Sequence, residues 1–294
     1  MTSLCVDVLG IGAWAAGLEG WPAMRAALRG DACSSATSSA TSFASIGAQC
    51  ASRPSPALLP AAERRRAPEG VAVALEVARE AVGMACAKHA LDVSSLASVF
   101  ASAHGDLPIV DYLCATLATD PMQLSPTRFH HSVHNAAAGY WSIATHDTAP
   151  ASAIAAGDET FAAGLLEAAT QACAEHRPVL LVAFDTPAVG PLSLAAPNTA
   201  LFGMATVLAP AMHTVKSALA AHTINGTITL TIGIRDGATV LPFPQIAKLR
   251  ALAASSPSAR ALALAEALAQ GRDARIEYPL SAASTLVIDA RSTR

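Results

Sequence analysis

The chain has 294 residues, of which 52% are hydrophobic and 14% are charged, and its formal net charge is −3. This length is enough for one large core or for two packed layers with extensions. Because the longest basic run is Arg64-Arg65-Arg66, we expect no nucleic-acid partner. The scarcity of charge favours a buried partner interface, although an Ala-rich composition also raises the apolar count without creating sticky surface.

Several other classes are disfavoured by the same sequence. No window has the uncharged apolar length that a membrane span needs, and the first ten residues lack the basic region of a signal peptide, so we expect a cytoplasmic protein. The six cysteines are scattered with no Cys-x-x-Cys pair, which predicts neither a zinc site nor a disulfide framework. We therefore expect no metal and no cofactor.

The first ninety residues predict a strand and two helices. Residues 4–12 alternate in hydrophobicity and end in Gly10-Ile-Gly12, and a helix is expected at 21–29. The Gly-x-Gly pattern is loosely similar to a dinucleotide-binding fingerprint, but no strand-helix-strand unit closing on a ribose-binding acid follows. Residues 31–60 are rich in Ser, Ala and Pro and predict a loop. A helical apolar stripe with Pro68 at its start then runs over 63–89.

A strand at 97–103, a helix at 106–118 and a Pro-bounded turn at 120–126 precede a histidine-rich segment at 129–143. Its small residues predict a helix that another helix can approach closely. Helical spacing brings two imidazoles to one side, which is compatible with a metal site, but no acidic or thiol ligand lies beside them. We favour hydrogen-bonding roles at an interface or around a cavity mouth for His130, His131 and His134.

Residues 150–164 contain the most informative pattern in the chain. A short apolar run breaks at Gly157, and an Ala-rich helical pattern follows at once. Such a strand-turn-helix layout puts the side chain of Asp158 at a tight turn against a helix N-terminus. Asp is also a favoured N-cap, so its oxygen is expected to accept from the backbone N–H groups of residues 159–161.

The last third predicts mostly strands. Residues 178–184 and 199–208 are apolar and end at Ala209-Pro210. An alternating stretch at 223–234 starts with an Asn225-Gly226 turn signal. Two helical patterns at 245–253 and 259–269 and a strand at 284–289 complete the chain.

The segment from Pro150 to Gly164 resembles the nucleophile elbow of β-ketoacyl synthases of the thiolase superfamily. In that elbow a Pro, a small-residue strand, a Ser/Ala-rich turn, the acyl-accepting Cys and a helix follow in this order. Aligned without gaps, the Cys position falls on Asp158. The opening strand, the Arg cluster, the His-Ser-Val-His-Asn segment and the tail over 256–270 extend the resemblance nearly end to end, to the small chain-length-factor type of this family.

The resemblance implies an α/β, thiolase-like layered α-β-α fold, mainly the N-terminal half of a ketosynthase with a short C-terminal extension. It places the half-thiolase domain at residues 1–210 and an α+β extension packed on it at 211–294. In full-length enzymes, two histidines of the second half hold the extender carbonyl. This chain is too short to contain that half, and His222 is the nearest approach to its histidine motif.

The function implied is a non-catalytic, chain-length-factor-like subunit. It would pair with an active β-ketoacyl synthase and shape the tunnel for an acyl or polyene chain of the aryl-polyene class. The resemblance implies an interface at the helix over 135–143 and the strand over 151–156. The interface and tunnel candidates are Phe129, His130, His131, His134, Asn135, Tyr140, Trp141 and Ser152.

Two questions stay open from the sequence. Arg64, Arg65 and Arg66 are candidates to receive the acidic surface or phosphate of an acyl carrier protein, but a solvated helix entry is the favoured explanation, because exposed charges contribute little. The aromatic rings are either tunnel wall or ordinary core. An alternative function is an independent carrier-thioester enzyme, a malonyl decarboxylase or a hydrolase that uses another cysteine with His134.

Overall fold

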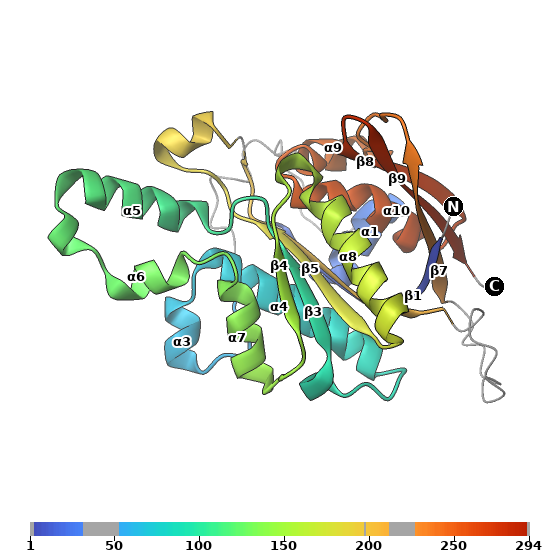
Figure 1. Cartoon of the computed structure of the whole chain (residues 1–294), viewed down its shortest axis with the longest axis horizontal. Helices are drawn as coiled ribbons and strands as arrows, with labels where there is room; N and C mark the ends of the chain where they lie inside the picture. Colours follow the sequence, from blue (N-terminus) through green and yellow to red (C-terminus); the bar gives the residue numbers. More distant parts are fainter. Residues whose placement is uncertain (1–2, 32–52, 197, 212–226, 293–294) are drawn as a thin grey trace.

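The computed structural model describes residues 3–31, 53–196, 198–211 and 227–292. The strands in these ranges form one mixed sheet in the order β4-β3-β5-β6-β1-β7-β9-β8, with β2 paired to β1 (Figure 1). Their bounds are β1 (Leu4–Ala15), β2 (Leu18–Glu19), β3 (Ala97–Ala101), β4 (Ala151–Ile154), β5 (Val179–Asp185), β6 (Phe202–Pro210), β7 (Ile228–Asp236), β8 (Ala274–Ser281) and β9 (Ser284–Ser292).

Helices cover both faces of this sheet. The α-helices are α1 (Trp21–Arg29), α3 (Ala61–Arg66), α4 (Glu69–Cys86), α5 (Leu107–Thr119), α6 (Pro126–His131), α7 (Ala136–Thr145), α8 (Thr160–Glu175), α9 (Ala247–Ala253) and α10 (Leu262–Gln270). The 3₁₀ segments are η1 (Val93–Ser95), η2 (Pro121–Gln123), η3 (Gly157–Glu159), η4 (Gly190–Leu194) and η6 (Ser258–Ala261).

The two faces bury separate hydrophobic clusters. α4 packs across β1, β6 and β5 and, together with α7, covers one cluster. α8 packs on the other face with α1, α9 and α10 around the second cluster. The result is the layered α-β-α arrangement that the resemblance implied, with the core divided between the sheet's two sides (Figure 1).

The glycines of β1 allow α4 to lie directly on the strand. A Cβ on Gly12 would sit 2.1 Å from the carbonyl oxygen of Val77, and one on Gly10 would sit 2.0 Å from that of Ala81. Both distances are far below van der Waals contact, so only glycine fits at these positions. The Gly-x-Gly pattern therefore serves helix-on-strand packing in this chain.

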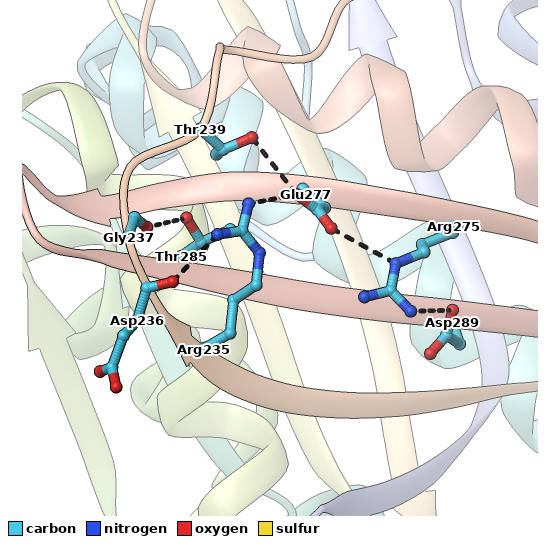
Figure 2. A network of polar contacts seen from close by, with 8 residues as sticks. All are labelled: Arg235, Asp236, Gly237, Thr239, Arg275, Glu277, Thr285 and Asp289. Atoms are coloured by element: carbon cyan, nitrogen blue, oxygen red, sulfur yellow. Dashed lines mark hydrogen bonds and ion pairs between the residues drawn. The ribbon is translucent and has the colours of Figure 1, made fainter.

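Sheet polarity changes along the molecule. β3 pairs in parallel with both β4 and β5, whereas β5, β6, β1, β7, β9 and β8 pair in antiparallel fashion in that order. The strands from residues 228–292 thus extend the same sheet that residues 4–210 begin. Side chains on β7, β8 and β9 are joined by a chain of polar contacts (Figure 2).

Glu277 of β8 is central to these contacts. Its carboxylate lies 2.6 Å from Arg235 Nη2 and 3.3 Å from Arg275 Nε, and Arg275 Nη1 lies 3.6 Å from an oxygen of Asp289. The Arg235 guanidinium lowers the pKa of Glu277. The β8 edge of the sheet is therefore charged and also contains Pro279, two features that discourage a further strand from pairing there.

Most sequence expectations coincide with these elements, with three exceptions. The helix expected over 63–89 is divided into α3 and α4, because Ala67 precedes Pro68 and is extended, with ψ 136°. The helix expected over 129–143 is likewise two helices, α6 and α7. The strand β8 was not predicted, since its charges and Pro mask the alternation of Ile276 and Tyr278.

Some expectations fall on positions that the structure does not cover. Most of the loop over 31–60, the Asn225-Gly226 turn and His222 lie outside the described residues. Among the residues that are described, no helix combines the length and apolar character needed to cross a membrane.

We predict that Gly12→Ala lowers the free energy of unfolding by about 1–3 kcal/mol or more, because the added methyl must push α4 off β1. Gly83→Ala is the matched control: Gly83 lies in α4 and has open space around it, so the change should stabilise the protein by about 0.5–1 kcal/mol. Urea unfolding of both variants is the measurement. Equal midpoints would refute the close approach of α4 to β1.

Candidate functional site

The candidate site lies where the three parallel strands end. Because β3, β4 and β5 run in the same direction, the loops that follow them meet at one edge of the sheet. We call residues 102–107, 155–159, 186–196 and 198 the strand-end rim. The Ser102 N–H donates to the Ile154 carbonyl over 3.0 Å, which holds the first two loops together.

A buried carboxylate fixes this rim to the C-terminal segment. Asp185 is fully buried at the end of β5, and its Oδ1 accepts from Ser102 Oγ at 3.2 Å and from the Ala103 N–H at 3.0 Å. Its Oδ2 accepts from the Ser258 N–H of η6 at 2.8 Å. Burial raises the pKa of Asp185, and these donors partly offset that shift. One side chain thus connects β3, β5 and η6.

Two further side chains fasten the rim to helix starts. Thr186 Oγ1 accepts from the Leu107 N–H at 2.9 Å, and Asp106 accepts from the Ile109 N–H as the N-cap of α5. The other oxygen of Asp106 accepts from the Gly70 N–H in the first turn of α4, over 3.2 Å. Burial raises the pKa of Asp106. The base of α5 is therefore held against α4.

The elbow itself is shaped by Gly157 and Thr160. Gly157 has φ +54°, a left-handed conformation that favours glycine, and it opens the short η3 before α8 begins. Thr160 is fully buried; its Oγ1 accepts from the Ala156 N–H at 3.0 Å and donates to the Gly157 carbonyl at 2.7 Å. The strand-turn-helix prediction is thereby confirmed.

The predicted capping role of Asp158 is not what the structure shows. The N-cap position of α8 is Glu159, and no side chain caps that helix start. Asp158 instead lies within η3 and forms an ion pair with Arg260 of η6, with Oδ2 and Nη2 3.0 Å apart. Arg260 Nη1 also donates to the main-chain carbonyl of Asp158. The buried Thr160 hydroxyl makes the hydrogen bonds that stabilise the turn. The Asp158 carboxylate is therefore available to pair with Arg260, 102 positions away in the sequence.

Arg260 is held in place by Tyr278 of β8. The Tyr278 hydroxyl donates to the Arg260 carbonyl and accepts from the Leu264 N–H, each over 3.1 Å. Tyr278 is buried, its ring meets Phe161 of α8 edge to face at 5.3 Å, and burial raises its pKa. The C-terminal segment thus contacts the elbow from two sides, through Arg260 and through Tyr278.

The histidines predicted at an interface or cavity mouth have different environments. His131 Nε2 lies 2.8 Å from the Tyr140 hydroxyl, and burial lowers the pKa of His131. His134 Nε2 lies 2.8 Å from the Ser102 carbonyl, which links the start of α7 to the rim. His130 stacks at a tilt on His131. In the described part of the chain, no three metal-ligating side chains converge.

The other interface and tunnel candidates differ in exposure. Phe129 at the end of α6 is 58% exposed, whereas Trp141 of α7 is buried in the cluster beneath α4. Tyr140 is half-buried against the same cluster, and Asn135 is exposed at the start of α7. The Ser152 hydroxyl accepts from Gln171 of α8 at 3.2 Å. Of the three rings, Phe129 is the most accessible to another molecule.

The arginine cluster forms the last turn of α3. Arg64 donates from Nε and Nη2 to the Leu59 carbonyl, at 3.3 and 3.1 Å, so its guanidinium closes the turn before the helix. Arg65 and Arg66 are exposed. Two of the three arginines therefore remain accessible to an acidic partner.

Two residues of this site were not predicted from the sequence. Asp185 ends an apolar strand, and a charge at that place is a usable signal because the ends of parallel strands meet at one edge. Arg260 carries no local signal, since it lies in an Ala-rich helical pattern and its partner is far away in sequence.

Comparison with known proteins identifies the family. Residues 40–229 match the model of the β-ketoacyl synthase N-terminal domain, which is more than half of the chain. The chain therefore belongs to the β-ketoacyl synthase family, and the resemblance seen in the sequence is confirmed. No curated protein sequence matches the chain.

Solved structures share the fold at low sequence identity. The ketosynthase ApeO in complex with its chain length factor ApeC from Xenorhabdus doucetiae matches with a TM-score of 0.64 and 21% identity, over 97% of this chain and 99% of that one. The ishigamide ketosynthase/chain length factor matches with a TM-score of 0.62 and 14% identity, over 99% and 100%. A chain of the AntDE:AntF structure, a complex of a type II polyketide synthase acyl-carrier protein with its ketosynthase, matches with a TM-score of 0.67 and 11% identity, over 100% of both chains.

Proposed function

We propose that this chain is a non-catalytic, chain-length-factor-like subunit that pairs with an active β-ketoacyl synthase and shapes the tunnel for a growing acyl chain. The observation that carries the proposal is Asp158, an ion-paired carboxylate at the elbow position where the sequence resemblance to β-ketoacyl synthases places a cysteine. The pathway class we propose is polyketide-type biosynthesis with aryl-polyene-like products. Structural neighbours that include ketosynthase/chain length factor complexes support the chain-length-factor role, and the aryl-polyene class rests on the sequence resemblance.

The chemistry of the elbow explains why condensation is lost. A cysteine thiolate accepts an acyl group as a thioester, which exchanges cleanly with a carrier thiol. An acyl group on Asp158 would form a mixed anhydride that water destroys. Its carboxylate is moreover already bound to Arg260, so an attack on a thioester would have to break that ion pair.

An apolar arm supports the presence of a partner. α5, η2 and α6 project from the body of the molecule (Figure 1), and only Leu107 of α5 is buried. Tyr112 braces the arm: its hydroxyl accepts from the Ser125 N–H at 3.3 Å, and the Arg128 guanidinium lies 4.0 Å from its ring centroid. The exposed large apolar side chains on and beside this arm are Leu117, Met122, Phe129, Val133 and Ile143. An apolar projection that is held in one conformation is better suited to bind a partner than to remain exposed to solvent.

The two edges of the sheet differ in a way that also supports pairing. The β8 edge carries Arg275 and Glu277 (Figure 2), and it also contains Pro279. The β4 edge reads Ala-Ser-Ala-Ile, with no charge and no Pro. An unprotected edge strand offers free backbone groups to a second strand. Pairing at β4, beside the exposed Ile143 of α7, would join two sheets into one and bury a large apolar area.

The carrier-protein contact remains a proposal that rests on Arg65 and Arg66. Both are exposed at the end of α3, and an acidic or phosphorylated surface would pair with them. The competing function, an independent thioester enzyme, has no comparable support. His134 would be its base, but its Nε2 is hydrogen-bonded to the Ser102 carbonyl.

We predict that the purified chain forms no covalent adduct when incubated with an acyl-carrier thioester, because Asp158 cannot hold an acyl group. Intact-mass spectrometry is the measurement, with an active ketosynthase as the positive control. Asp158→Cys alone should not restore condensation in the isolated chain, since a thiolate without carbonyl-binding histidines cannot complete the reaction. An acyl adduct on the native chain would overturn the non-catalytic role.

We predict that Ile143→Arg and Ala153→Arg each weaken binding to the partner ketosynthase on the order of 100-fold, because a buried unpaired charge costs about 3 kcal/mol or more. Both positions are exposed in the chain itself, so the changes should spare its fold. A charge at Ala137 would be a poor test, since this residue is buried in the chain's own core.

The matched control for this experiment is Val240→Arg, because Val240 is 87% exposed in the segment between β7 and α9. Co-purification of the co-expressed pair reports binding. If both interface variants co-purify with the ketosynthase as well as the control does, the interface lies elsewhere.

We predict that Phe129→Ala in the reconstituted pair shifts products to longer chains. Forcing an added methylene against the tunnel wall costs about 1–3 kcal/mol, so removing a ring from the wall should allow elongation to continue. Phe243→Ala is the control, because Phe243 is also partly exposed but lies between β7 and α9. The measurement is the product profile by mass spectrometry. A lower yield at unchanged product length would mean that Phe129 serves only in packing and does not form the tunnel wall.

A further inference from the structure

We propose that Arg260 makes the elbow an anion-binding position and that Asp158 is its resident anion, so that the pair clasps the elbow to the C-terminal segment. This inference concerns the elbow alone and holds whether or not the chain pairs with a ketosynthase. Its starting point is the double contact of one guanidinium with one residue: Nη2 lies 3.0 Å from Oδ2 of Asp158, and Nη1 donates to the main-chain carbonyl of Asp158.

The two contacts have different consequences. The bond to the side chain recognises negative charge at position 158, whereas the bond to the carbonyl fixes the backbone conformation of η3. Arg presents its donors in a planar fork, so both bonds are made without further loss of side-chain freedom. Arg260 is therefore a positioning residue for the elbow as well as a counterion.

The exposed fractions of the two side chains show which member of the Arg260–Asp158 pair is held in place. The Arg260 side chain is 16% exposed, while that of Asp158 is 69% exposed. The Arg260 main chain is held by the buried Tyr278, whose ring also packs on Phe161 of α8. The cation thus belongs to a rigid part of the molecule, and an enclosed guanidinium without a counterion would be strongly destabilising. Asp158 is the group that satisfies it.

The elbow adds a second favourable field for an anion. Position 158 lies in the turn that leads into α8, a helix of 16 residues, and the N-terminal end of a helix favours negative charge. A thiol at this position would therefore face the same cation that Asp158 faces now. The elbow retains the electrostatics that stabilise a thiolate, with a carboxylate present in its place.

The test replaces the resident anion by a titratable probe. In Asp158→Cys, iodoacetamide alkylates the thiolate: a sulfur–carbon bond forms, iodide leaves, and the thiol proton has gone to solvent. The rate against pH gives the thiol pKa, followed by mass spectrometry of the peptide that contains residue 158. We expect a pKa below the ordinary value for cysteine, and about a tenfold slower reaction at neutral pH when Arg260→Gln is added. Arg260→Lys should keep most of the rate.

Cys114 provides an internal control, because it is exposed on α5 and its alkylation rate should not change between variants. Equal thiol pKa values with and without Arg260→Gln would overturn the proposal. So would a rate that falls equally for the Lys and Gln replacements, since that outcome would mean that the charge is irrelevant.

A second measurement uses the native anion and covers the case in which the cysteine variants fold poorly. Arg260→Gln in the otherwise native chain should speed backbone hydrogen exchange over residues 155–165 by several-fold, while β5 stays protected. The melting-temperature losses of Asp158→Asn and Arg260→Gln should add to less than their sum, because Arg260→Gln removes the ion pair that Asp158→Asn removes, together with the bond to the main-chain carbonyl. Unchanged exchange at the elbow, or fully additive losses, would show that no clasp exists.

Discussion

The geometry of the rim depends on the buried carboxylate of Asp185. Removing a carboxylate from water costs several kcal/mol, and the three donors that reach it from β3 and η6 offset this cost by about 1.5–3 kcal/mol each. The bonds can all form only if β3, β5 and η6 are in register at this point. Asp185 thus sets where η6 begins, and the position of η6 in turn brings Arg260 to the elbow.

Periodicity predicted most of the fold, because strands and helices with one apolar face carry their own signal. The prediction was wrong where a local backbone preference competed with that signal. Pro68 separates the Arg-rich α3 from the apolar stripe of α4, and Ser132 to Asn135 separate α6 from the small-residue helix α7. β8 was missed for the opposite reason: its outer face is charged in order to protect an edge, and this makes the strand resemble a loop.

The candidate site was predictable only in its local part. Gly157 and the helical pattern after it locate the elbow, and Asp158 stands out because it occupies the position where the family resemblance places a cysteine. Its partner could not be found in this way. The Asp158–Arg260 pair joins residues 102 positions apart, and a carboxylate at a helix start is equally compatible with capping until the Thr160 hydroxyl is seen to occupy the turn. Tertiary contacts, rather than the local sequence, therefore determine that Asp158 forms an ion pair and does not cap the helix.

The few charged residues of the chain are distributed unevenly between the elbow, the two edges of the sheet and the projecting arm. Only 14% of the residues are charged, and several of those near the elbow and on the β8 edge pair with one another: Arg260 with Asp158, and Arg235 and Arg275 with Glu277. β4, the exposed side of α7 and the arm of α5 and α6 have few charges and several exposed apolar side chains. Ion pairs therefore close the elbow and one sheet edge, while the opposite edge is left suitable for a partner. This distribution fits the subunit role proposed above, because charge is paired where the elbow must be closed and sparse where a partner would dock.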